Sequence, residues 1–252
     1  MTVFVRADRA AVARDVAAIV RETVARHPRA VLGLPTGRTP IPIYAELRAV
    51  AASGVVDFRG VATFNLDEFV GLAPDDPRSY RAFMEQELFA HVPIGPGRVG
   101  FLRGTAPDLD AECARYEQAI AGAGGIDLLL LGVGANGHVG FNEPGEALIA
   151  RTHVATLMPG TRAANADPFG GDVAAVPRLA LSMGMATILQ ARRIVLVATG
   201  SSKAAAVRAM VEGALTTQLP ASFLQLHPDV SVVLDERAAS QLSPASRLAP
   251  AR

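Results

Sequence analysis

Short apolar runs alternate with amphipathic stretches along this chain, and this alternation constrains the fold more than any other feature. Five strand-like runs lie at 30–34, 61–66, 126–131, 194–198 and 232–234. Between them apolar residues recur at helical spacing, and a helix over 8–27 precedes the first run. Strands without apolar/polar alternation are typical of a sheet covered on both faces, and intervening helices make that sheet mostly parallel. The sequence therefore predicts an α/β fold, a doubly wound sheet with helices on both faces.

Domain boundaries are absent from the sequence as far as residue 240. No Ser/Gly linker or change in composition divides residues 1–240, so we expect a single domain followed by a disordered tail at 241–252. In residues 145–175, Gly, Pro and Ala interrupt both the helical and the strand spacing of apolar residues. This pattern favours a mobile lid insertion over a site.

Charge and hydropathy exclude several partners. The 24 basic side chains balance 24 acidic ones, so no basic surface is predicted for nucleic acid or an anionic membrane. No apolar run approaches the ~18 residues of a membrane span, and the N-terminus lacks the apolar core of a signal peptide. The single Cys113 agrees with a reducing compartment. We expect a cytoplasmic protein, and a homo-oligomer is compatible with the sequence.

The first candidate site is the loop Thr36-Gly37-Arg38-Thr39, which follows the run at 30–34. Ligands of open parallel sheets bind beyond the carboxyl ends of the strands. Small residues in such a loop let backbone N–H groups approach an anion, and the next helix points its positive end at the same place. The loop is compatible with a phosphate site, although an ordinary strand-turn-helix connection fits the same residues.

The second candidate is the pair Asp67-Glu68, at the tip of the strand expected over 61–66. Adjacent side chains of an extended chain point in opposite directions, so one carboxylate can face a ligand while the other supports it. The alternative interpretation is an ordinary acidic turn, since functional carboxylates with perturbed pKa values are the minority case.

The third candidate is the glycine-rich loop 132–144, which follows the most apolar strand. Its titratable side chains are His138 and Glu143. Histidine exchanges protons near neutral pH, and a carboxylate beside it fixes its tautomer and raises its basicity. This arrangement predicts a catalytic base with an orienting acid. No His, Cys or Asp pair has convincing metal-ligand spacing, so we expect no metal requirement.

The fourth candidate is Lys203, the only lysine among the 24 basic residues. It follows the run at 194–198 and opens a helix, where a cation opposes the helix dipole at a cost of up to ~1 kcal/mol. A bound phosphate would remove this cost, whereas a chance surface lysine is the alternative.

Several of these strings together resemble the glucosamine-6-phosphate deaminase (isomerase) family, which is related to the 6-phosphogluconolactonases. The match runs from about Ala30 to Glu236 in the right order and spacing, and NLDEF (65–69) with GHVGFNEPG (137–145) are its most specific strings. The resemblance implies conversion of D-glucosamine 6-phosphate and water to D-fructose 6-phosphate and ammonia in amino sugar catabolism. It also implies that no cofactor takes part and that the partner is a small sugar phosphate.

The same resemblance implies roles for the catalytic candidates. Asp67 is similar to the base that moves a proton between C2 and C1, and His138 to the base that opens the pyranose ring. Glu143 resembles the acid that orients this histidine, and Asn136 occupies a position that is Asp in some members.

Phosphate binding is implied for the loop and the lone lysine. The resemblance implies that the phosphate is held by Arg38, Thr39 and Lys203. It also implies that Thr36 and Gly37 complete the substrate-binding loop.

Two departures from the family pattern lead to further expectations. Asp167 stands where the family has a lid arginine, while Arg38 stands where its loop has a small residue. We hypothesise that the cation has moved from lid to loop, and that Asp167 points away or meets another substrate group. His153 and Ala155 replace the basic residues of the effector pocket in regulated members, which predicts hyperbolic kinetics.

Three alternatives stay open at this stage. A 6-phosphogluconolactonase-type hydrolase would not need Asp67, because lactone hydrolysis has no C2–C1 proton transfer. A deaminase of galactosamine 6-phosphate would use the same residues, and analogy of fold does not distinguish the two sugars. A sugar-sensing domain of a transcription regulator would carry a helix-turn-helix segment, for which the first 29 residues offer only one helix.

Overall fold

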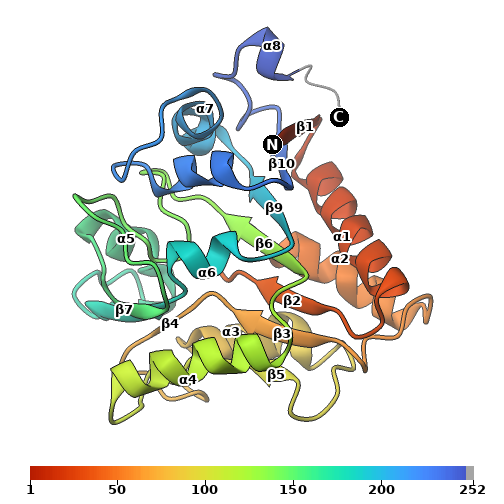
Figure 1. Ribbon diagram of the computed structural model, residues 1–252, viewed down its shortest axis with the longest axis vertical. Helices are drawn as coiled ribbons and strands as arrows, with labels where there is room; N and C mark the ends of the chain where they lie inside the picture. The colour runs from red at the N-terminus through yellow and green to blue at the C-terminus, as the bar shows by residue number, and fades with distance from the viewer. Residues whose placement is uncertain (248–252) are drawn as a thin grey trace.

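A seven-stranded parallel sheet forms the centre of the computed structural model, which describes residues 1–247 (Figure 1). Its strand order is β1-β10-β9-β6-β2-β3-β5, with every neighbouring pair parallel. The bounds are β1 (Thr2–Arg6), β2 (Val31–Leu34), β3 (Ala62–Asn65), β5 (Val99–Gly100), β6 (Leu128–Gly132), β9 (Arg193–Ala198) and β10 (Val230–Asp235). The predicted doubly wound, mostly parallel sheet is confirmed.

Helices cover both faces of this sheet, and the strands contribute alternate residues to two cores. In β6, Leu128 and Leu130 join the core under α1 (Arg9–Arg26) and α2 (Ile41–Ala52). Leu129 and Leu131 face the other core, with α4 (Leu109–Gly122), α6 (Met185–Leu189) and α7 (Ala204–Glu212). Each fully buried leucine contributes about 1.5–3 kcal/mol relative to an exposed one. An unbroken apolar run is therefore the sequence that a strand between two helical layers requires.

The chain begins with a strand, which corrects the expectation that a helix precedes every other element. Residues of β1 pair in parallel with β10 at the edge of the sheet, from Thr2 opposite Ser231 to Arg6 opposite Asp235. Helix α1 then starts as expected, because the Asp8 carboxylate accepts the backbone N–H of Ala11 at 2.8 Å. A five-residue edge strand carries too few buried residues to be recognised by periodicity alone.

A second, antiparallel sheet was not expected. It has the order β4-β8-β7 and is formed by β4 (Asp67–Phe69), β7 (His153–Thr156) and β8 (Leu179–Ser182). The segment 145–175, expected to be an irregular lid, contributes β7, α5 (Pro159–Ala164) and the 3₁₀ turn η2 (Asp167–Phe169). A third apolar core, around Phe69, Phe141 and Phe169, joins this segment to the sheet. The insertion therefore has regular secondary structure and its own packing.

The remaining elements connect the layers. They are α3 (Tyr80–Met84), the π-helical turn η1 (Glu85–Phe89), the 3₁₀ turns η3 (Ser201–Lys203) and η4 (Pro220–Leu226), and α8 (Pro244–Arg247). Residues 241–247, where we expected a disordered tail to begin, contain α8 and the buried Leu242. Residues 248–252 of that expected tail lie outside the described residues. Within residues 1–247, none of the helices has the length and apolar character needed to cross a membrane.

Candidate active site

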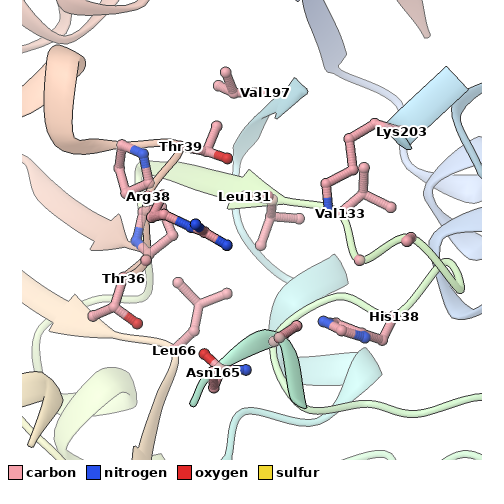
Figure 2. Close-up of a pocket in the computed structure, with 18 of the residues that line it drawn as sticks. Thr36, Arg38, Thr39, Leu66, Leu131, Val133, His138, Asn165, Val197 and Lys203 are labelled. Atoms are coloured by element: carbon pink, nitrogen blue, oxygen red, sulfur yellow. The ribbon is translucent and has the colours of Figure 1, made fainter. Parts of the chain in front are cut away.

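A cavity of about 720 Å³ lies where β2, β6 and β9 end (Figure 2). Its wall includes the loop 35–40, Asp67, the glycine-rich loop 132–138, helix α5 of the segment expected to be a lid, and Lys203. All four sequence-predicted segments therefore contribute to one cavity. Parallel strands direct their carboxyl ends to the same edge of a sheet, so the loops that follow them converge there.

Asp67 is the first residue of β4 and pairs with Ser182 of β8. Its side chain lines the cavity, yet the residue is only 7% exposed. Burial and, to a smaller extent, the Glu68 charge together raise the pKa of Asp67 to about 8, although a hydrogen bond with Thr36 acts in the opposite direction. A carboxyl group with such a pKa can accept and return a proton near neutral pH.

Glu68 points away from the cavity and binds the beginning of α3. Its carboxylate accepts the backbone N–H groups of Phe69 at 2.8 Å, Tyr80 at 3.0 Å and Arg81 at 2.9 Å. Burial raises the pKa of Glu68 to about 7, although these backbone hydrogen bonds lower it. The expected division between one carboxylate facing the ligand and one supporting it agrees with this geometry.

His138 and Glu143 face one another across the glycine-rich loop. The distance from His138 Nδ1 to Glu143 Oε2 is 3.5 Å, at the outer limit of a hydrogen bond. Asn136 donates its side-chain N–H to the same Glu143 oxygen at 3.0 Å, and its own side-chain oxygen accepts the His138 backbone N–H at 3.2 Å. Burial raises the pKa of Glu143, but His138 and Asn136 outweigh it and lower the value to about 2. The carboxylate is therefore ionised at neutral pH and is placed to orient the imidazole.

Two glycines allow the close packing around these side chains. A Cβ at Gly134 would lie 2.3 Å from the His138 ring, so the ring rests directly against the backbone there. Gly140 has a φ of +56°, and a Cβ on it would lie 3.7 Å from the Asp67 carboxylate. The loop that carries His138 therefore reaches Asp67, and the two candidate bases share one end of the cavity.

Arg38 and Lys203 approach the cavity from opposite walls, as Figure 2 shows. Arg38 reaches in from the loop after β2, beside Thr39, and Lys203 extends from the turn η3 after β9. Burial lowers the pKa of Lys203, and the Arg38 charge lowers it further. Two cations directed at one volume provide the charge that a phosphate group needs. Thr36 and Gly37 complete the wall, with Gly37 at a φ of +95° that favours glycine.

We expect from the sequence that Asp167 points away from the site or meets another substrate group. In the structure it does neither, because its carboxylate pairs with Arg38. Its Oδ2 lies 3.1 Å from Nη1 of Arg38, and this ion pair connects the 3₁₀ turn η2 of the lid with the loop after β2. The arginine in the loop and the acid in the lid are thus partners.

Sequence reasoning missed three residues that complete the cavity. Tyr80 of α3 donates its hydroxyl to the Asn165 side chain at 3.0 Å, which joins α3 to the lid. Arg9, the first residue of α1, donates to the backbone oxygen of Arg38. No local motif marks these positions, because their partners lie 85 and 29 residues away.

Among residues 1–247, which the structure describes, no three His, Cys, Asp or Glu side chains are grouped closely enough to hold an ion.

Comparison with known proteins supports one family for the whole chain. A family model described as glucosamine-6-phosphate isomerases/6-phosphogluconolactonase matches residues 7–233. Glucosamine-6-phosphate deaminase 2 of Bacillus subtilis is 48% identical over 231 residues, which cover 91% of this chain and 93% of that protein. Glucosamine-6-phosphate deaminase of Beutenbergia cavernae is 49% identical over 234 residues, covering 91% and 90%.

Solved structures give the same result. A structure described as a monomeric glucosamine-6-phosphate deaminase matches with a TM-score of 0.93 and 44% identity, covering 96% of this chain and all of that one. A 6-phosphogluconolactonase from Trypanosoma cruzi matches with a TM-score of 0.76 at 20% identity, covering 96% of this chain and 97% of that one. The second match shows a shared fold.

Proposed function

The chain belongs to the glucosamine-6-phosphate isomerase/6-phosphogluconolactonase family, and we propose that it converts D-glucosamine 6-phosphate and water into D-fructose 6-phosphate and ammonia. The observation that carries this proposal is the convergence of Asp67, His138 and two cations on one cavity, with Glu143 behind His138. The reaction needs one base to open the sugar ring, a second to move a proton between carbons, and a charged site for the phosphate. The cavity supplies each of these groups.

His138 acts as the base in ring opening. A neutral imidazole takes the proton of the C1 hydroxyl as the bond between C1 and the ring oxygen breaks, and the ring oxygen receives a proton in exchange. The resulting imidazolium is stabilised by the ionised Glu143, 3.5 Å away. Asn136 holds this carboxylate in place through the hydrogen bond at 3.0 Å.

Asp67 transfers the proton in the isomerisation step. The carboxylate removes the proton from C2 of the open-chain sugar while one proton of the C2 ammonium group passes to the C1 oxygen, which gives an enolamine. The same carboxyl group then delivers its proton to C1 and leaves a protonated imine at C2. The pKa of about 8 means that most of the empty enzyme holds Asp67 protonated at neutral pH. The ammonium group on C2 of the substrate favours the ionised carboxylate, because an opposite charge within about 4–6 Å lowers the pKa of an acid. Substrate binding thus generates the base where it is needed.

Deamination follows from the product of this transfer. The imine at C2 adds water, and the C–N bond breaks with release of ammonia, so the overall equation balances without a redox change. We infer that Arg38, Thr39 and Lys203 hold the phosphate during these steps, with Thr36 and Gly37 forming the wall of the subsite.

The domain organisation, oligomeric state and location of the enzyme are part of the same proposal. We infer that residues 1–240 act as one catalytic domain, because both sheets supply residues to one cavity. A solved deaminase structure that matches this chain with a TM-score of 0.93 is described as monomeric, so we expect an active monomer, and a homo-oligomer stays the alternative. A cytoplasmic location is supported by the buried free thiol of Cys113 and by a phosphorylated substrate.

An ammonia-release assay tests the reaction. Wild type and Asp67→Asn are incubated with glucosamine 6-phosphate, galactosamine 6-phosphate and unphosphorylated glucosamine. We expect ammonia from the first sugar, none above background from the variant, and little from glucosamine. Equal release from all three sugars would show that the phosphate subsite is misassigned, and full activity of Asp67→Asn would refute the proton transfer.

A further inference from the structure

An ion pair at the edge of the cavity joins its phosphate side to the lid. Arg38 Nη1 and Asp167 Oδ2 are 3.1 Å apart, and the two side chains are 76% and 70% exposed. Exposed pairs of this kind stabilise proteins by little, because water screens them and both side chains lose freedom. A phosphate dianion can therefore compete for the Arg38 guanidinium.

Arg38 is held at its backbone, and its side chain is largely exposed. Arg9 of α1 donates to the Arg38 carbonyl oxygen, which fixes the loop to the body of the protein. The guanidinium lies in the cavity wall opposite Lys203, as Figure 2 shows. One guanidinium thus stands between a carboxylate of the lid and the volume that Lys203 also faces.

We propose that Asp167 lowers the affinity of the site for the phosphate group by competing for Arg38, and so limits how tightly the site binds phosphate-bearing ligands. This inference rests on the proposed function, because it assigns Arg38 to the phosphate subsite. In the empty site Asp167 neutralises Arg38. When phosphate binds, Arg38 turns toward it or is shared, and the Asp167 carboxylate then repels the dianion. A free phosphate ion binds weakly for this reason, whereas the sugar phosphate gains additional contacts from the sugar.

The direction of the effect follows from the charges. Replacing Asp167 with Asn removes a negative charge beside the subsite and releases Arg38. An interaction of the size measured for exposed pairs, up to about 1 kcal/mol, corresponds to about fivefold in a dissociation constant. We therefore expect Asp167→Asn to bind phosphate about two- to fivefold more tightly than wild type.

Binding of inorganic phosphate, measured by isothermal titration calorimetry in a phosphate-free buffer, tests this without turnover. Five proteins are compared: wild type, Asp167→Asn, Arg38→Gln, the double variant, and the control Asp172→Asn. Asp172 is an exposed lid carboxylate that accepts the backbone N–H of Ala174, so the control changes the net charge equally. We expect tighter binding for Asp167→Asn and unchanged binding for the control.

The double variant distinguishes competition for Arg38 from general repulsion. If Asp167 acts through Arg38, its substitution changes phosphate affinity much less when Arg38 is already Gln. Equal gains in both backgrounds, equal gains in the control, or no gain at all would each overturn the proposal. A rise in ionic strength should reduce the difference between wild type and Asp167→Asn, since both charges are exposed.

Steady-state kinetics with glucosamine 6-phosphate separate this inference from the proposed reaction. Asp167→Asn should lower KM by a similar factor while kcat changes much less. Absence of ammonia release from wild type, with the calorimetric pattern intact, would refute the reaction and leave the anion subsite standing. Ammonia release with no change in KM or phosphate affinity would refute the role of Asp167 alone.

Discussion

Replacing Asp67 with Asn should abolish activity and make the empty protein more stable at alkaline pH. The isolated carboxyl loses its proton near pH 3.8, whereas in the fold the pKa is about 8. Because the folded pKa is raised, the native state binds the proton more tightly, and stability falls as the pH rises from about 4 to 8. One pKa unit corresponds to about 1.36 kcal/mol, so the ionised carboxylate costs the empty fold up to about 6 kcal/mol well above pH 8. Asp67 is only 7% exposed, so water relieves little of this cost.

Urea unfolding at pH 5 and pH 8 measures the difference in the free energy of unfolding between wild type and Asp67→Asn. From the same pKa values, wild type should lose about 3–4 kcal/mol relative to Asp67→Asn between these two pH values. Phosphate buffers are avoided, because an anion bound at Lys203 would stabilise the native state. Asp172→Asn, which changes an exposed carboxylate, serves as the control and should follow wild type. If the stability difference between wild type and Asp67→Asn is the same at both pH values, the raised pKa of Asp67 is wrong.

Three other predictions concern catalysis and regulation. Gly134→Ala places a Cβ 2.3 Å from the His138 ring, so kcat should fall about 10²-fold with the circular dichroism spectrum unchanged. Glu68→Gln removes the charge that raises the pKa of Asp67, so the rise of kcat/KM with pH should move to lower pH; an unmoved profile would contradict the coupling. Saturation with glucosamine 6-phosphate should be hyperbolic and unaffected by N-acetylglucosamine 6-phosphate, because His153 replaces a basic residue expected in regulated members; a sigmoidal curve would count against this.

The functional segments could be located from sequence because each follows an apolar strand that leads to the same edge of the sheet. Burial between two helical layers imposes an unbroken apolar run, which is visible at 128–131, and the residues after it must line that edge. The glycines around His138 also helped to locate the candidate site from sequence. The His138 ring packs directly on the backbone of Gly134, which leaves no room for a side chain there.

The lid was harder to predict, because its strands are short and pair with residues far away. Ser182 of β8 lies opposite both Asp67 of β4 and His153 of β7, so three distant segments form one small sheet. None of these segments has enough residues to show a clear period, and packing around Phe69 and Phe169 supplies the missing stabilisation. The edge strand β1 escaped prediction for the same physical reason.

The sequence by itself determined the parallel sheet, the candidate acid–base side chains and the presence of an unusual arginine in the loop and an unusual acid in segment 145–175. Only the tertiary structure decided that Arg38 and Asp167 are partners and that Arg9 secures the same loop. It also showed that Glu68 binds the start of α3 while Asp67 faces the cavity. Periodicity reports whether a residue is buried, which is a local property of the chain. Contacts between residues 29 or 129 positions apart depend on how the layers pack, and no local sequence pattern reports which distant residues meet.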